Sequence, residues 1–101
     1  MKSPDFSVVR RGIFYPKNRY KTTEIAMIST LDQYIIDAVR KKRRAQKVSQ
    51  AMLGAWIGVN RGFIGQVESP KCDVKYSVTH LNEIAKYLGC SPRDFLPEKP
   101  L

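Results

Sequence analysis

A single glycine, Gly58, separates two short segments with helical apolar spacing, and this arrangement limits the fold more than any other feature of the sequence. Apolar residues recur four apart before it and three apart after it, which is the spacing of one helix face. Glycine here permits the positive φ of a tight turn, and Asn60 can cap the helix that follows. Residues 49–68 therefore predict two short helices that cross steeply. Their apolar positions are Leu53, Ile57, Ile64 and Val67.

The rest of the sequence from residue 30 onward also predicts helices with recognisable ends. The first is expected to extend to about residue 44, and the fifth is a short turn that opens with a proline. Residues 30–98 therefore predict a compact, all-α, five-helix domain, with residues 99–101 as a tail. The caps are Ser29 or Thr30, Ser49, Ser77 and Ser91, and the glycine that closes the fourth helix is Gly89. The apolar stripe of the fourth helix comprises Val78, Leu81, Ile84, Ala85 and Leu88.

The N-terminal extension, residues 1–29, differs in composition from the rest. Residues 7–15 and 20–28 are rich in Val, Ile, Thr, Tyr and Phe, and a Pro-Lys-Asn-Arg segment separates them. This pattern predicts a two-stranded β-hairpin. Because an isolated hairpin is marginally stable in water, we expect the extension to dock on the helical domain, to pair with another subunit as a dimerisation arm, or to stay partly disordered.

The pattern over residues 49–68 is that of a helix-turn-helix, in which the second helix is held out for insertion into a DNA major groove. The sequence resembles the Cro/cI-type (lambda-repressor-like, XRE) helix-turn-helix proteins over roughly residues 31–98. A Ser-Gln start, the turn glycine, an Ile-x-x-Val-Glu ending and an Ile-Ala-x-x-Leu-Gly helix occur in register. The matching segments are VSQAMLGAWIGVNRGFIGQVESP and HLNEIAKYLGCSPRDFLP. The resemblance implies a small bacterial regulator of transcription.

The resemblance also implies which side chains contact DNA. In this family the glutamine that opens the second helix contacts the phosphate backbone, and here that residue is Gln50. The early residues of the third helix face base edges, which points to Arg61, Gly62, Phe63 and Gln66 in the helix expected over residues 61–68. Arginine pairs with guanine and glutamine with adenine through two hydrogen bonds each, and a phenylalanine ring can cover a thymine methyl. The alternative is that Arg61 and Gln66 are ordinary exposed helix residues.

The net charge predicts a polyanionic partner. The chain carries 18 Lys and Arg against nine Asp and Glu, a formal net charge of +9. Six of the basic residues fall between residues 40 and 47, at the expected end of the first helix. They can be a solvated helix end whose cations offset the macrodipole, or a cluster that contacts DNA phosphates. The phosphate-contacting residues that we expect are Arg40, Lys41, Arg43, Arg44, Lys47, Gln50 and Asn60.

Arg43 and Glu68 form a further pair that the resemblance implies. In this family an arginine six residues before the Ser-Gln start commonly pairs with the glutamate that ends the recognition helix, and the spacing here matches. Two parallel hydrogen bonds make such a pair stronger than an isolated surface ion pair. We therefore expect an Arg43–Glu68 ion pair that ties the first helix to the third.

Trp56 departs from the family pattern, because it occupies a position that is usually polar and exposed. A tryptophan left in water is unusual, so we expect the N-terminal extension or a second subunit to cover it. The alternative is a rotated second helix in which Trp56 belongs to the core. Gly54 and Lys42 also depart from the pattern, since they stand where alanine and leucine are usual.

The sequence contains no motif that indicates catalytic, metal or cofactor chemistry. One histidine, His80, and two cysteines, Cys72 and Cys90, are too few for a four-ligand zinc site or a disulfide scaffold. No glycine-rich phosphate loop follows a strand. No apolar run approaches the ~20 residues of a membrane span, and the N-terminus lacks a secretory signal pattern. We expect a cytoplasmic, nucleoid-associated protein that is not an enzyme and holds no cofactor or metal.

These observations together predict a sequence-specific DNA-binding transcriptional regulator, a repressor, that acts as a homodimer on double-stranded DNA. One recognition helix covers only a few base pairs, so we expect two half-sites about one helical turn apart. Two alternatives remain. The chain can be the DNA-binding, antitoxin-type partner of a small protein, held through residues 1–29 or Trp56. It can also be a bridging factor that contacts the transcription machinery.

Overall fold

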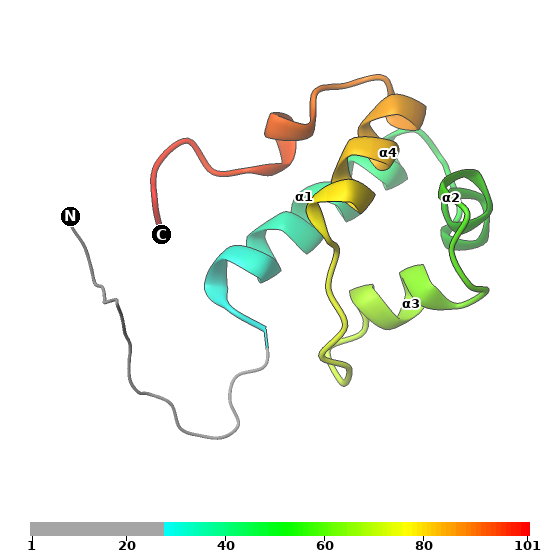
Figure 1. The fold of residues 1–101 in the computed structure, drawn as a ribbon, viewed down its shortest axis with the longest axis horizontal. Coiled ribbons are helices and arrows are strands. Elements are labelled where there is room, and N and C mark those ends of the chain that lie inside the picture. The colour runs from blue at the N-terminus through cyan, green and yellow to red at the C-terminus, as the bar shows by residue number, and fades with distance from the viewer. Residues whose placement is uncertain (1–27) are drawn as a thin grey trace.

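A computed structural model describes residues 28–101, so the hairpin expected in the N-terminal extension lies outside the described residues. The described part of the chain is all-helical (Figure 1). None of its helices is long and apolar enough to cross a membrane. The elements are α1 (Thr30–Ala45), α2 (Gln50–Ile57), α3 (Phe63–Glu68), α4 (Val78–Leu88) and the 3-10 helix η1 (Pro92–Phe95).

Serine side chains start most of these helices, as the sequence predicts. Ser29 accepts a hydrogen bond from the backbone N–H of Asp32, whose carboxylate accepts from the backbone N–H of Ser29 in return. Ser77 and His80 form the same reciprocal capping box at the start of α4. Ser49 caps α2 by accepting from the backbone three residues later. Each cap supplies a partner to a backbone N–H that the first helical turn leaves unpaired.

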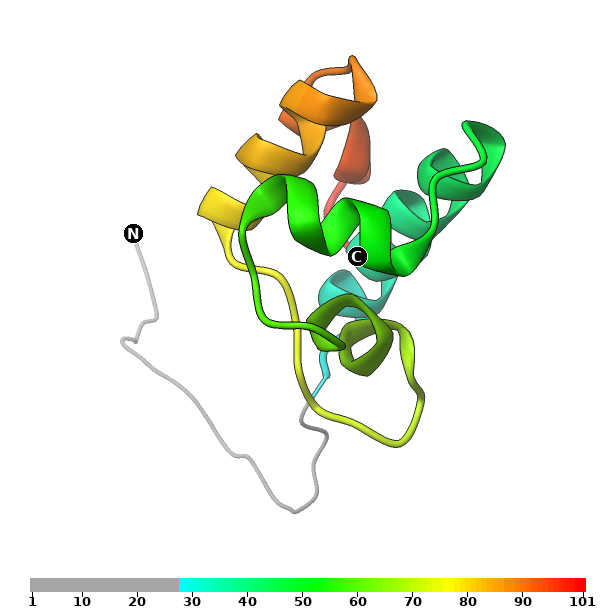
Figure 2. The ribbon, with the colours of Figure 1, turned by 90° about the vertical axis from the view of Figure 1, so that its right-hand side faces the viewer.

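The helices pack around one apolar core. Helix α2 contacts both α3 and α4, while α1 contacts α3 and η1. Figure 2 shows α2 lying across α3, and Figure 1 shows both helices at one end of the molecule, beside α1 and α4. The paired short helices are therefore carried on a scaffold of the two long ones. The core comprises Ile36, Val39, Val48, Leu53, Ile64, Val67, Tyr76, Leu81, Ile84, Ala85, Leu88 and Phe95.

Three details differ from the sequence prediction. Helix α3 begins at Phe63, and Asn60 does not cap it, because Gly62 adopts a φ of 87° that interrupts the helix and itself stands at the N-cap. The backbone carbonyl of Asn60 instead accepts from the N–H of Phe63 at 3.0 Å, closing a turn. The expected fifth helix is a single 3-10 turn. Val78, which is expected on the apolar stripe of α4, is 83% exposed.

Gly58 provides a test of the turn. It closes α2 with a φ of 74°, and a Cβ at this position would meet nothing within 4 Å. Gly58→Ala is therefore expected to lower the free energy of unfolding by about 1–2 kcal/mol through backbone conformation alone. Asparagine tolerates the left-handed region better, so Gly58→Asn should cost less. Urea denaturation measures both, and wild-type stability in Gly58→Ala would contradict this account of the turn.

Candidate nucleic-acid interface

Helix α3 buries one face and leaves the other in solvent. Ile64 and Val67 are buried in the core, at 2% and 3% exposure. Arg61 and Gly62 in the preceding turn, and Gln66 one turn into the helix, are exposed. The turn and α3 thus expose three of the four positions that the sequence predicts as base contacts. Two of these three, Arg61 and Gln66, carry side chains that can form paired hydrogen bonds with a base.

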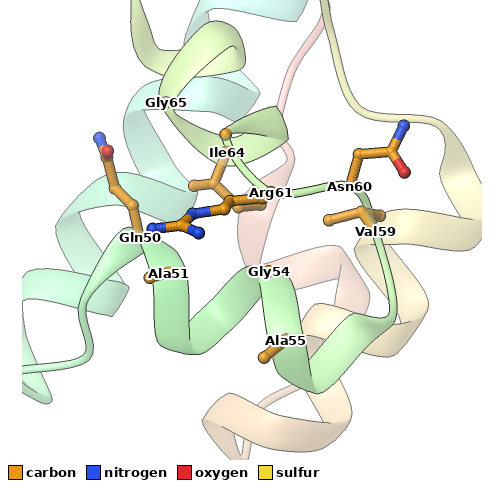
Figure 3. A pocket seen from close by; sticks show the side chains of 10 residues that line it. Gln50, Ala51, Gly54, Ala55, Val59, Asn60, Arg61, Ile64 and Gly65 are labelled. Carbon is orange, nitrogen blue, oxygen red and sulfur yellow. The ribbon is translucent and has the colours of Figure 1, made fainter.

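A cleft of about 540 Å³ lies between α2 and α3. Figure 3 shows the Arg61 side chain extending over it and Gln50 standing at its edge, where α2 begins. Much of its lining is small, so the backbones of the two helices lie near the surface. The lining residues are Gln50, Ala51, Gly54, Ala55, Val59, Asn60, Arg61, Gly62, Ile64 and Gly65.

Arg43 and Glu68 form the ion pair that the resemblance implies. Arg43 donates from Nε to Oε2 of Glu68 at 3.0 Å and from Nη2 to Oε1 at 2.8 Å. Its Nη1 donates to the backbone carbonyl of Val48 at 2.7 Å. The two side chains are 7% and 4% exposed. The pair ties α1 to the end of α3 and to the loop before α2. Because its guanidinium is buried and engaged here, Arg43 is not the phosphate contact that we expected.

Two more side chains converge on Glu68. Gln50 donates from Nε2 to Oε1 of Glu68 at 2.9 Å. Arg40 donates from Nη2 to the backbone carbonyl of Glu68 at 2.8 Å, and its Nε lies 3.6 Å from Oε1. The first residue of α2 and two turns of α1 are thereby fixed to the last residue of α3. The sequence predicts Gln50 and Arg40 as phosphate contacts, and it does not predict these bonds within the protein.

An aromatic cluster holds the start of α3 against the region that leads into α4. The ring of Phe63 lies 5.0 Å from the ring of His80 and 6.3 Å from that of Tyr76, between centroids. Phe63, expected to face the bases, is half-buried in this cluster. Burial raises the pKa of Tyr76 well above its usual range. Tyr76 was not predicted as a core residue, because it lies in a loop where no periodicity marks it.

The remaining cations at the end of α1 are open to solvent. Lys41, Arg44 and Lys47 are exposed. Lys47 has a φ of 60°, in the left-handed region that terminates the helix before α2 begins. Asn60, in the turn before α3, is exposed too. These four residues keep the accessibility that a phosphate contact requires.

Trp56 lies on the surface and not in the core. Its ring stacks on that of Tyr87 in α4, with centroids 5.6 Å apart and an angle of 22° between the planes. Trp56 is 36% exposed and Tyr87 is 49% exposed. The alternative of a rotated α2 with Trp56 in the core is therefore wrong. The expected cover by the N-terminal extension lies outside the described residues.

The histidine and the cysteines have ordinary structural settings. Nδ1 of His80 accepts from the backbone N–H of Ser77 at 3.0 Å, as part of the capping box. Cys72 and Cys90 are free thiols, and burial raises the pKa of Cys90. Across residues 28–101, no group of three or more His, Cys, Asp and Glu side chains is placed to hold a metal ion.

Together, the crossed α2 and α3 and the Gly58 turn between them form a helix-turn-helix, and the Arg43–Glu68 pair ties it to α1. No family model and no curated protein matches the chain. Among solved structures, the chain is similar to the restriction-modification controller protein C.AhdI from Aeromonas hydrophila, with 25% sequence identity and a TM-score of 0.55. The similarity covers 62% of this chain and 92% of that one.

The buried pair yields a prediction for stability. Arg43→Met leaves the Glu68 carboxylate in the interior without its main countercharge, and such a change typically costs about 3–5 kcal/mol of unfolding free energy. The double variant Arg43→Met with Glu68→Leu removes both charges and should recover most of that loss. Urea denaturation measures both.

The exposed Lys86–Glu83 pair supplies the matched control. Lys86→Ala is expected to change the unfolding free energy by less than about 1 kcal/mol, because a solvated pair contributes little. If Arg43→Met were as mild as this control, the buried pair would not hold the helices together.

Proposed function

We propose that this chain is a DNA-binding regulator of transcription that reads the major groove with Arg61 and Gln66. The observation that carries the proposal is the exposed face at the start of α3, where both side chains stand free of the core. The buried Arg43–Glu68 pair fixes the end of the same helix. The likeness to C.AhdI, a controller protein, supports a regulator. Repression by occupying a promoter is the simplest consequence of such binding.

In this proposal Arg61 and Gln66 discriminate bases. Arginine donates two hydrogen bonds to O6 and N7 of guanine, and glutamine pairs with N6 and N7 of adenine. Each such pair is worth about 1–3 kcal/mol of discrimination against a wrong base. Gly62 adds no side chain, so its backbone can approach the base edges closely. Phe63, half-buried against His80, positions the start of α3 more than it contacts DNA.

Affinity comes from cations that surround this face. Lys41, Arg44 and Lys47, with Gln50 and Asn60, supply the proposed phosphate contacts, and the exposed part of Arg40 can join them. Contacts of this kind release counterions, so they set salt dependence and not sequence choice. We further propose a homodimer, because one helix as short as α3 spans few base pairs and two-fold-related half-sites multiply its specificity.

A second candidate function rests on the surface stack of Trp56 and Tyr87. Exposed aromatic pairs are typical of protein contacts, so the chain can be the DNA-binding, antitoxin-type partner of a small protein. This function predicts a small protein that co-purifies with the chain, and a lone chain with full operator affinity would argue against it. A bridging factor that contacts the transcription machinery would instead show weak, sequence-indifferent DNA binding.

Selection of bound sequences from a random DNA pool tests the proposed function directly. We expect enrichment of a palindromic consensus with half-sites centred about one helical turn apart, as a two-fold dimer requires. A single non-repeated half-site would reject the dimer. No enrichment at all would reject sequence-specific binding and favour the bridging factor.

The division between specificity and affinity is tested by charge-matched substitutions. Arg61→Ala should relax the preference at one base position, with a loss of about 1–3 kcal/mol on the selected site and a smaller loss on random DNA. Lys41→Ala or Arg44→Ala should weaken binding to both DNAs alike and lower the salt slope by about one unit. Lys86→Ala removes the same charge from α4 and serves as the control. Equal effects of Arg61→Ala on both DNAs would contradict base reading.

A further inference from the structure

Glu68 holds the amide of Gln50 in one orientation. Nε2 of Gln50 donates to Oε1 of Glu68 at 2.9 Å. A carboxylate paired with an arginine offers only acceptors, so the NH2 end of the amide must face Glu68. In residues 28–101 this bond uses one N–H of Gln50, and the second N–H and the oxygen Oε1 stand at the exposed start of α2. The amide is therefore oriented before any DNA arrives.

Gly65 leaves the space in which this amide lies. A Cβ at residue 65 would lie 3.2 Å from Oε1 of Gln50 and 4.0 Å from its Cδ, so the amide oxygen would have to shift by a few tenths of an ångström. The backbone gives no other reason for glycine here, because the positive-φ glycines are Gly58, Gly62 and Gly89. Helix propensity gives none either, since glycine is a poor helix former. The amide of Gln50 lies close to Gly65, and a larger residue at this position would disturb that contact.

We propose that Gly65 is a positioning residue for DNA binding. The gap that it leaves lets Gln50 reach Glu68 and present its second N–H to a DNA phosphate. The inference rests on the proposed function, in which Gln50 contacts the phosphate backbone. A methyl group at residue 65 pushes the amide oxygen by a few tenths of an ångström and thereby strains the Nε2 bond to Glu68. An amide held less firmly in the unbound protein costs more to order on binding.

A double-mutant cycle on the full chain tests the inference, with affinity measured for a fixed duplex of arbitrary sequence because a phosphate contact is not sequence-specific. Gly65→Ala should weaken binding roughly threefold to tenfold, the range that one hydrogen bond represents. In a Gln50→Ala background the same substitution should have no further effect. Equal losses in both backgrounds would mean that the methyl group meets DNA directly, and this would overturn the proposal. Unchanged affinity of Gly65→Ala would overturn it as well.

Gly54→Ala is the matched control, because Gly54 is the other glycine inside a described helix. Its added Cβ would make ordinary contacts at 3.6 Å with Ile64 and Val59 and would not meet Gln50. It should bind DNA as the wild type does, and neither alanine variant should melt at a lower temperature than the wild type.

A readout without DNA separates this inference from the proposed function. In the free protein, the side-chain NH2 resonances of Gln50 should shift in Gly65→Ala and stay in place in Gly54→Ala. If the wild-type chain binds no duplex DNA, the proposed function is rejected, whether or not the Gln50 resonances shift. If the wild-type chain binds duplex DNA but Gly65→Ala leaves the Gln50 resonances unchanged, only the positioning role of Gly65 is rejected.

Discussion

One buried carboxylate, that of Glu68, holds together the end of the molecule where α1, α2 and α3 meet. It accepts two hydrogen bonds from Arg43 of α1 and one from Gln50, the first residue of α2. Helix α3 has only six residues and no side-chain cap, so it cannot be stable by itself. Its position depends on Ile64 and Val67 in the core and on this carboxylate at its end. An unpaired buried charge is costly, so Arg43 and Glu68 must be kept or lost together.

The same interaction separates two kinds of basic residue. Arg43 belongs to the interior, whereas Lys41, Arg44 and Lys47 on the same run remain in solvent. In the proposed function, the net charge of +9 favours binding to the DNA phosphates but does not determine which sequence is bound. The choice of DNA sequence depends instead on Arg61 and Gln66, and only Arg61 is charged.

Patterns that act locally could be predicted from the sequence. The serine caps, the Gly58 turn and the apolar spacing predict α1, α2 and α4 almost to the residue. The resemblance supplied the Arg43–Glu68 pair, which periodicity alone does not reveal. Contacts that depend on tertiary packing could not be predicted, because no local pattern marks them. Examples are the burial of Tyr76, which lies in a loop, and the hydrogen bond between Gln50 and Glu68. Helix α3 begins two residues later than the sequence predicts, because Asn60 has the residue type of a cap, whereas Gly62 adopts a left-handed φ that no sequence pattern marks.

In the proposed function, DNA binds the face formed by Gln50, Arg61 and Gln66. Titration of the isotope-labelled chain with duplex DNA, followed by NMR, tests it most directly. Binding at this face predicts the largest chemical-shift changes at these three residues and at Gly62. The indole N–H resonance of Trp56, which stacks on Tyr87, should not shift. Chemical-shift changes concentrated at Trp56 and Tyr87, with the resonances of residues 61–66 unchanged, would contradict binding at this face.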